Sequence, residues 1–311
     1  MVRMRTYIDS HTHMDHKRFD SNRKSIIELS HDSGIEFMVN SAIGFETNYS
    51  MQKQLDKYDF IKYSVGIHPN YVGVDENMDT EWEAGLLRLL AGSDKSAKTV
   101  AIGETGLDFH RLTRDANGEL DEVGVIKLSR QYTWFRKQTM LAGMLKLPMI
   151  LHIRSADSKS IRKVNNRDDS VMIEHVDAHK EAIKILKEFD ESLMVGIKGV
   201  VHCFTSEKMS DAEEYIRMGY MLGIGGAFTY SENVELKDII QQVPLEYIVL
   251  ETDSPFVLPA DIQESEAYLG KRNTPLSIPY IAERLAALKG ISVDEVAAVT
   301  TENAKRLFRI E

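Results

Sequence analysis

The sequence predicts an α/β fold, a (β/α)₈ TIM barrel in a single domain. Short runs with strand character alternate with longer amphipathic segments, which is the pattern of repeated βα units around a parallel sheet. Eight strand-like runs occur within 311 residues, and barrels of this type often use about 250 residues as one domain. No linker, internal repeat or low-complexity tract divides the sequence, so we expect one domain over residues 1–311.

The strand-like runs are short and end near Gly, Asp, His or Pro. Residues 199–204 and 247–250 are apolar on consecutive positions, as expected for strands that are covered on both faces. The eight expected strands are residues 5–9, 36–42, 62–67, 99–103, 148–153, 199–204, 221–227 and 247–252.

Amphipathic segments between the strands predict the helices. Apolar residues three and four positions apart indicate helices at residues 125–146, 178–189 and 277–288. Ser292 and Glu295 have the spacing of a capping box, which predicts the start of a terminal helix that continues to Phe308.

Two connections are longer than a plain barrel requires. The connection after the fourth strand, residues 111–124, is polar and contains a turn signal from Asp115 to Gly118. The connection after the fifth strand, residues 156–177, exceeds the dozen or so residues and single helix that a crossover needs. The loops that follow strands form the catalytic face of this fold, so we expect both insertions to help shape the substrate site.

The composition argues against several classes of protein. A formal net charge of −10 disfavours a broad basic surface for gripping duplex nucleic acid, because that affinity depends on Lys and Arg. Cys203 is the only cysteine, which excludes an intrachain disulfide and a cysteine-rich zinc site. The first residues lack the apolar stretch of a signal peptide, and no apolar run is long enough to cross a bilayer. We therefore expect a cytoplasmic protein without membrane contact; the oligomeric state is left open, with a monomer favoured.

Histidine and carboxylate residues recur at or just beyond the expected strands. The carboxyl ends of barrel strands meet at one face, so these side chains should converge. In the His-x-His segment at residues 11–13, both rings point to the same side, because side chains alternate along an extended chain. The six expected metal ligands are His11, His13, Glu104, His152, His202 and Asp253.

Each of these residues also has a purely structural interpretation, because a lone buried histidine or strand-end carboxylate is often satisfied by hydrogen bonds. The complete set favours metal binding, since burying several imidazoles and two carboxylates without a cation would be costly. Six ligands exceed the three protein ligands and one water of a mononuclear catalytic zinc site. We therefore expect two divalent ions bridged by Glu104, and the identity of the ions (Mg, Mn or Zn) is left open.

Eight motifs in order along the chain carry a family resemblance. They are IDSHTHMD at 8–15, VGIHP at 65–69, AIGETGLD at 101–108, LPMILHIR at 147–154, VHCF at 201–204, LETDSP at 250–255, RNTP at 272–275 and ENAKRLF at 302–308. Together they resemble the TatD-like metal-dependent deoxyribonucleases of the amidohydrolase superfamily. The resemblance covers nearly the whole chain.

The resemblance implies two metal positions and a reaction. One position would use His11, His13, Glu104 and Asp253, and the other would use Glu104, His152 and His202. The implied reaction is hydrolysis of DNA phosphodiester bonds, often from the 3′ end, which makes DNA, as single strands or 3′ ends, the expected partner.

The chain departs from the family pattern at two places. Asn70 stands where a second histidine is usual, and Thr205-Ser206 stands where Ser-Gly is common. These departures and the two insertions leave every expected metal ligand in place. We therefore expect them to affect which substrate the protein takes and not whether it binds metal.

We assign the catalytic roles to Glu104 and Asp253. In a two-metal site, a water becomes acidic and attacks phosphorus while the ions neutralise the phosphate oxygens. Asp253 is expected to orient that water and accept its proton, and a role as a ligand alone is the alternative.

Three residues are expected to bind the substrate. His68 faces the same barrel mouth and could donate a hydrogen bond to phosphate, or it could fix the turn at Pro69. Arg154 lies two residues beyond His152, where its planar fork could grip phosphate or pair with Asp157. Arg272 belongs to a polar stretch beyond the eighth strand that could meet the nucleic-acid backbone or be solvated.

The second insertion carries further charged and titratable groups. Its basic cluster, which either supplies a local positive field or is simply solvated, consists of Lys159, Arg162, Lys163 and Arg167. His175 and His179 have near-helical spacing, and we expect them to be surface histidines.

Two other functions remain open. A small-molecule amidohydrolase, such as a lactonase or deaminase, would use the same hydroxide on a carbonyl, and an ester hydrolase could act on charged RNA. Glu104 favours the nuclease, because many small-molecule members bridge their metals with a modified lysine and no lysine occupies that strand end.

Overall fold

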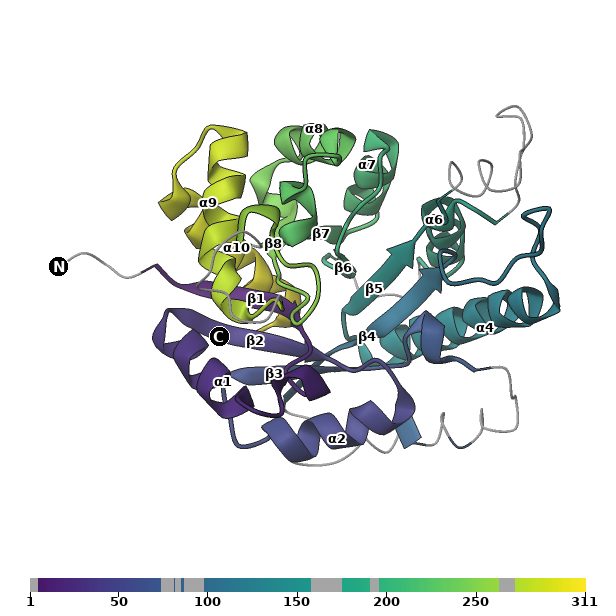
Figure 1. Ribbon diagram of the computed structural model, residues 1–311, viewed down its shortest axis with the longest axis horizontal. Helices are drawn as coiled ribbons and strands as arrows, with labels where there is room; N and C mark the ends of the chain where they lie inside the picture. Colours follow the sequence, from purple (N-terminus) through teal and green to yellow (C-terminus); the bar gives the residue numbers. More distant parts are fainter. Residues whose placement is uncertain are drawn as a thin grey trace.

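Eight parallel strands form the centre of the molecule. The computed structural model describes residues 5–73, 81, 85–86, 98–157, 175–190, 196–262 and 272–311. The strands pair in the order of the chain, from β1 to β8. A parallel bridge joins Thr12, at the end of β1, to Ser254, which follows β8, so the sheet nearly closes, with helices on its outside (Figure 1). The predicted (β/α)₈ barrel is confirmed.

The strands occupy the regions that the sequence predicted. They are β1 (Tyr7–Thr12), β2 (Ile35–Ser41), β3 (Ile61–Val65), β4 (Thr99–Asp108), β5 (Met149–Arg154), β6 (Gly199–His202), β7 (Tyr220–Ile224) and β8 (Ile248–Leu250). Residues that are adjacent along a strand pack into different hydrophobic clusters of the core. On β5, Met149 and Leu151 belong to one cluster, and Ile150 belongs to another. Both faces of the sheet are therefore buried, as the consecutive apolar residues indicated.

The helices that surround the barrel are α1 (Arg23–Asp32), α2 (Phe45–Leu55), α4 (Glu122–Leu145), α6 (Ala178–Glu188), α7 (Met209–Arg217), α8 (Val234–Gln242), α9 (Ile278–Lys289) and α10 (Val293–Phe308). Short 3₁₀ turns lie between them at η1 (Lys17–Phe19), η2 (Pro69–Tyr71), η5 (Gly226–Thr229), η6 (Leu245–Tyr247), η7 (Ala260–Ile262) and η8 (Pro275–Ser277). None of the helices in the described ranges is long and apolar enough to cross a membrane.

Side-chain caps decide where several helices begin. The Ser292 hydroxyl accepts the backbone N–H of Glu295 at 3.1 Å, which confirms the predicted start of α10. The Asp121 carboxylate accepts the N–H of Gly124 at 2.7 Å. This cap explains why α4 begins three residues before the predicted position.

Two strands extend further than predicted. β1 continues through Thr12 and β4 continues to Asp108, so His11 and Glu104 lie inside strands and not after them. The prediction ended both strands early because polar residues usually mark strand ends. Here the polar side chains point into a closed barrel, and Glu104 and Asp108 are buried.

The two predicted insertions have different outcomes. In the first, a bridge between Arg114 and Leu120 and a turn in which the N–H of Gly118 donates to the Asp115 carbonyl confirm the turn signal. Most of the second insertion, including Lys159, Arg162, Lys163 and Arg167, lies outside the described residues.

Candidate active site

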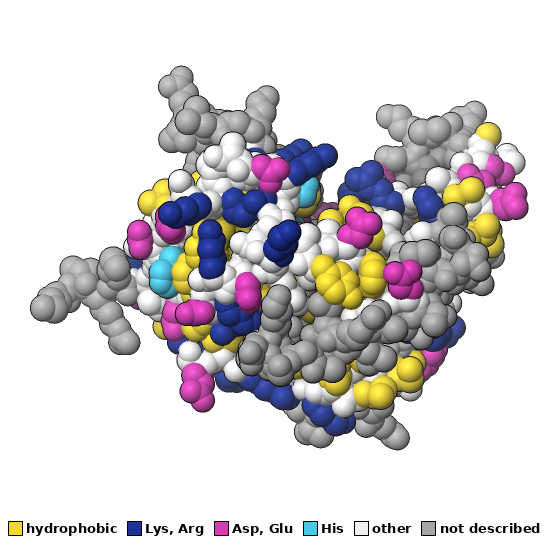
Figure 2. Space-filling view, turned by 90° about the horizontal axis from the view of Figure 1, so that it is seen from below, with side chains coloured by type: hydrophobic (Ala, Val, Ile, Leu, Met, Phe, Trp, Pro, Cys, Tyr) yellow, Lys and Arg dark blue, Asp and Glu magenta, His cyan; other side chains and the backbone are white. Residues whose placement is uncertain are grey.

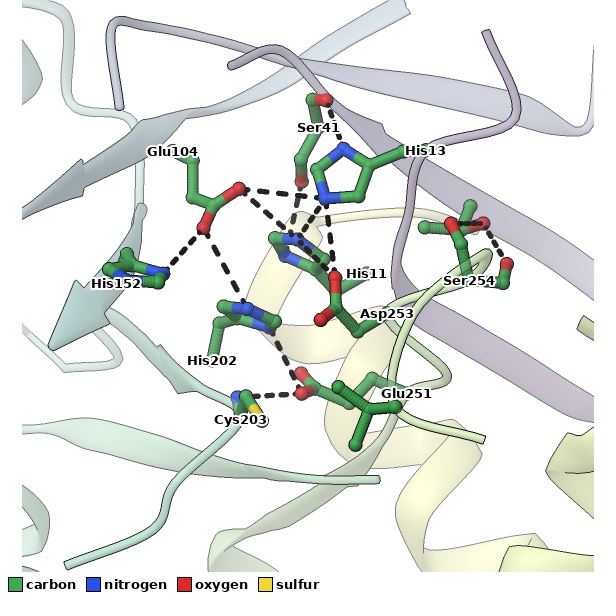
Figure 3. A network of polar contacts seen from close by, with 12 residues as sticks. His11, His13, Ser41, Glu104, His152, His202, Cys203, Glu251, Asp253 and Ser254 are labelled. Atoms are coloured by element: carbon green, nitrogen blue, oxygen red, sulfur yellow. Dashed lines mark hydrogen bonds and ion pairs between the residues drawn. The ribbon is translucent and has the colours of Figure 1, made fainter. Parts of the chain in front are cut away.

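Glu104, in the middle of β4, stands at the centre of a polar cluster, and its two carboxylate oxygens face different histidines (Figure 3). Its Oε1 atom lies 2.9 Å from Nδ1 of His152 and 3.7 Å from Nε2 of His202. Its Oε2 atom lies 3.4 Å from Nε2 of His11 and 3.7 Å from Nε2 of His13. One carboxylate thus joins two pairs of imidazoles that come from three strands.

Asp253 completes the side of the cluster that contains the His-x-His pair. Its Oδ1 atom lies 3.3 Å from Nε2 of His13 and 3.8 Å from Nε2 of His11. The two histidine Nε2 atoms lie 3.2 Å apart. The structure therefore brings all six predicted ligand residues together at the carboxyl end of the barrel (Figure 3).

Glycine at position 103 allows Glu104 to enter the barrel. Gly103 has a φ of 156°, and a Cβ atom there would lie 2.6 Å from the carbonyl oxygen of Ile150 on β5. Any side chain would clash with that neighbouring backbone. The glycine thus permits β4 to pass close to β5 at the point where the central carboxylate is needed.

The segment that carries Asp253 is tied to β1 by a buried carboxylate. Asp9 accepts hydrogen bonds from the backbone N–H of Thr252 at 3.0 Å and from its hydroxyl at 2.6 Å. Burial raises the pKa of Asp9 to about 8, although these hydrogen bonds oppose the rise. Asp9 and Thr252 therefore fix His11 and Asp253 relative to each other.

Ser41 contacts the Nδ1 atoms of both histidines of the His-x-His pair, His11 and His13. Nδ1 of His13 donates to the Ser41 carbonyl oxygen at 2.9 Å, and the Ser41 hydroxyl lies 3.2 Å from Nδ1 of His11. In a neutral His13 ring this leaves the lone pair on Nε2, directed toward Glu104 and Asp253. That is the tautomer that a metal ion requires.

Carboxylates hold the other two histidines. Nε2 of His152 lies 3.1 Å from Oδ2 of Asp108, and Nδ1 of His202 lies 3.0 Å from Oε1 of Glu251. Glu251 fits because residue 223 is glycine: a Cβ atom there would lie 2.2 Å from the Glu251 Oε2 atom. Sequence reasoning missed Asp108 and Glu251, although both stand within the quoted motifs.

The ionisable groups of the cluster shift one another strongly. Burial opposes ionisation of Glu104, but its contacts with His11 and His152 hold its pKa well below the usual range. Burial also opposes protonation of His13 and His152, but the neighbouring carboxylates outweigh it and raise the pKa of each to about 9. Protons therefore occupy these rings at neutral pH unless a cation displaces them.

The donor set fits divalent metal ions. The Glu104 Oε2 atom is buried and accepts no hydrogen bond from any described residue. Three sets of ligand atoms within this cluster lie close enough to share an ion, and one of them is His11, His13 and Asp253. Imidazole nitrogen and carboxylate oxygen are ligands that Zn, Mn and Mg accept, and a cation would satisfy the unpaired oxygen.

Comparison with known proteins identifies the family. The sequence model described as TatD related DNase matches residues 8–309. The chain belongs to the TatD-related DNase family. It is 32% identical over 306 residues to the metal-dependent hydrolase YabD of Bacillus subtilis, with 97% of this chain and 98% of YabD covered.

Two further relatives agree with this assignment. The protein named 3′-5′ ssDNA/RNA exonuclease TatD from a Rahnella species is 28% identical, with 94% of each chain covered. The crystal structure of the TatD homologue YjjV from Escherichia coli has a TM-score of 0.75 and 25% identity, with 98% of each chain covered. The chain is therefore a TatD-family metal-dependent hydrolase, which confirms the predicted family and class of enzyme.

His68 faces this TatD-family centre as a hydrogen-bond donor. Its Nδ1 atom accepts the backbone N–H of Asn70 at 3.0 Å, which also caps η2. Burial lowers the pKa of His68 to about 3, so the ring is neutral and carries its proton on Nε2, 3.5 Å from Glu104 Oε1. Asn70, a departure from the family pattern, donates to Asp108 at 2.8 Å.

The two predicted arginine contacts differ in their surroundings. Arg154 ends β5, is exposed, and lines a cleft of about 530 Å³ together with His110 and Thr205. The Arg272 guanidinium donates to the Arg18 carbonyl and, at 2.6 Å, to the Asn22 side chain. Arg154 thus faces open space, whereas Arg272 already has protein acceptors.

The expectation of two surface histidines in the second insertion is half wrong. His175 is exposed, as predicted. His179 is buried in α6, where its Nδ1 atom lies 3.3 Å from the Tyr215 hydroxyl of α7 and its ring packs against Phe204. The spacing of the two histidines could not reveal that α7 covers the second one.

Proposed function

We propose that the protein hydrolyses phosphodiester bonds of single-stranded DNA, starting from the 3′ end, at a centre that holds two divalent ions. One observation carries the proposal. The buried carboxylate of Glu104 presents one oxygen to His152 and the other to His11, as a bridge between two ion positions would. The name of the Rahnella relative, an exonuclease of single-stranded DNA and RNA, supports the choice of substrate.

The six clustered side chains divide into two ligand sets that share Glu104. One ion would be held by His11, His13, Glu104 and Asp253, and the other by Glu104, His152 and His202. When bound, divalent ions such as Mg²⁺, Mn²⁺ or Zn²⁺ supply an acidic water and neutralise charge on the phosphate oxygens.

Asp253 takes the proton from the water that attacks phosphorus. Burial opposes ionisation of its carboxyl group, but the contact with His13 and the charge of His202 lower its pKa. The group is therefore ionised at neutral pH. Its side chain is 15% exposed, whereas that of Glu104 is 2% exposed, so Asp253 is the more accessible of the two carboxylates to a water molecule.

His68 and Arg154 position the phosphate. The Nε2–H group of His68 points toward Glu104 and can donate to a non-bridging oxygen. Arg154 lines the cleft of about 530 Å³ described above, and its guanidinium has the planar shape that pairs well with phosphate. Contact between Arg272 and the substrate stays a prediction, since two of its donors already meet protein oxygens.

Binding of a polyanionic substrate must depend on groups near the site, because the protein as a whole is acidic. Figure 2 shows Lys and Arg interspersed with Asp and Glu across one face, in keeping with the net charge of −10. Long-range attraction of a polyanion is therefore weak. Affinity must come from the ions and from groups at the mouth of the barrel.

Product analysis tests this function. Metal-reconstituted protein should shorten a 5′-labelled single-stranded oligodeoxynucleotide one nucleotide at a time from the 3′ end, and Glu104→Gln should not. The same preparation is assayed on single-stranded RNA, a lactone, an amide and a carboxylic ester. Turnover of one of the small molecules without any cleavage of the oligonucleotide would contradict the proposal.

A further inference from the structure

Phe256 places an exposed aromatic ring beside His13, one of the proposed metal ligands. It follows Asp253 by three residues, and its N–H donates to the Asp253 carbonyl at 2.8 Å. Its ring meets that of His13 edge to face, with centroids 5.9 Å apart, yet the residue remains 38% exposed. The Arg18 guanidinium lies 5.7 Å from the centre of the same ring.

Tyr71 places a second exposed ring beside His68. The two ring centroids are 5.9 Å apart and nearly perpendicular, and Tyr71 is 51% exposed. Its ring lies against the backbone at Gly44, where a Cβ atom would be 3.4 Å from the ring atom Cδ1. The N–H of Tyr71 donates to the His68 carbonyl at 2.8 Å, so the ring is held close to His68.

The rings of Phe256 and Tyr71 contact histidines that face different carboxylate oxygens of Glu104. Phe256 contacts His13, which faces the Oε2 atom of Glu104, and Tyr71 contacts His68, which faces the Oε1 atom. Phe256 follows β8 and Tyr71 follows β3, so they come from separate parts of the barrel rim. A phosphate held at Glu104 therefore has an exposed aromatic ring on either side.

Building on the proposed nuclease function, on which this step rests, we infer that Phe256 and Tyr71 are stacking platforms for the nucleobases that flank the scissile phosphate. Proteins that bind single strands commonly combine aromatic rings, on which any base can stack, with cations that meet the backbone. Arg18 beside Phe256 supplies such a cation. Stacking needs unpaired bases, which gives the single-strand preference a physical cause.

The same features explain binding without a broad basic surface. A stacked base contributes affinity that does not depend on charge, and this suits an acidic protein. Stacking on an aromatic ring is tolerant of sequence, because every base has a flat π face. The site should accept all four bases and should discriminate against a sugar that carries none.

The test compares ordinary and abasic oligonucleotides. Affinity is measured with metal-loaded protein and a phosphorothioate oligonucleotide that resists cleavage, and single-turnover cleavage is measured in parallel on the normal diester. The variants are Phe256→Ala and Tyr71→Ala, with Phe256→Trp to retain a flat ring and Phe256→Leu to retain apolar packing on His13. Tyr49→Ala, which removes a 42% exposed ring from α2, is the matched control.

Stacking predicts that each alanine variant binds the normal oligonucleotide roughly 10- to 100-fold more weakly. Binding of an oligonucleotide that lacks the facing base should hardly change, Phe256→Trp should keep near wild-type affinity, and Phe256→Leu should not. Equal loss on normal and abasic strands, or no loss on either, would overturn the inference. Normal base-dependent binding without any cleavage by the wild type would instead overturn the proposed nuclease function.

Discussion

Replacing Glu251 by Gln should weaken one metal position and spare the other. Glu251 contacts Nδ1 of His202 at 3.0 Å and accepts the backbone N–H of Cys203 at 2.6 Å. Gln has nearly the same shape and keeps one oxygen for these contacts, but it lacks the charge that makes the His202 ring a stronger donor to a metal. Groups that support a ligand in this way typically change metal affinity about 10- to 100-fold.

The assay is a calorimetric titration of the metal-free protein, followed by direct measurement of bound metal. We expect the ion held through His202 to bind about 10- to 100-fold more weakly, whereas the ion at His11 and His13 keeps its affinity, because Ser41 supports that pair. Glu232→Gln, at an exposed position, serves as the control. Unchanged affinity for both ions, or equal loss of both, would show that Glu251 does not support the His202 position selectively.

Two further predictions concern chemistry and stability. Asp253→Asn should slow single-turnover cleavage about 10²- to 10⁴-fold at saturating metal, because Asn cannot accept the proton from the attacking water. The affinity for DNA should change little. Cleavage within a few-fold of wild type would exclude Asp253 as the base. Burial lowers the pKa of His179 to about 4, so only the unfolded chain gains this proton between pH 6.5 and 4. The free energy of unfolding should therefore fall by about 3 kcal/mol across that window, as followed by urea denaturation, and His179→Gln should lose this pH dependence. An equally steep fall in the variant would assign the effect to other groups.

The convergence of the six expected ligand residues was predictable because each of them stands at or near the end of a strand that the sequence reveals. His11 and His13 alternate on one extended segment, and His152 and His202 are paired in register on the neighbouring strands β5 and β6, so the barrel topology alone brings them together. The order of the strands follows from the alternation of strands and helices. No contact between distant residues had to be known in advance.

The supporting residues were not predictable from such patterns. Asp108 and Glu251 act on histidines of neighbouring strands, and the contact depends on register and on the space left by Gly223. The true ends of β1 and β4 were missed for a related reason. Their polar residues are buried by a closed barrel, whereas a sequence window treats polarity as a sign of solvent.

Stacking residues were missed because exposed aromatic rings carry no sequence signal of their own. Phe256 and Tyr71 gain significance only from the histidines beside them. Conversely, the spacing of His175 and His179 suggested equal exposure, and only the position of α7 makes them different.

The most direct test of the two-ion centre is a titration of activity against the number of ions bound to each chain. Metal-free protein should keep its circular dichroism spectrum, because the core comes from barrel packing, and it should not cleave single-stranded DNA. Activity should rise as ions are added and reach its plateau at two ions per chain. Full activity with no bound metal, or a plateau at one ion per chain, would contradict the assignment of Glu104 as a bridge between two ions.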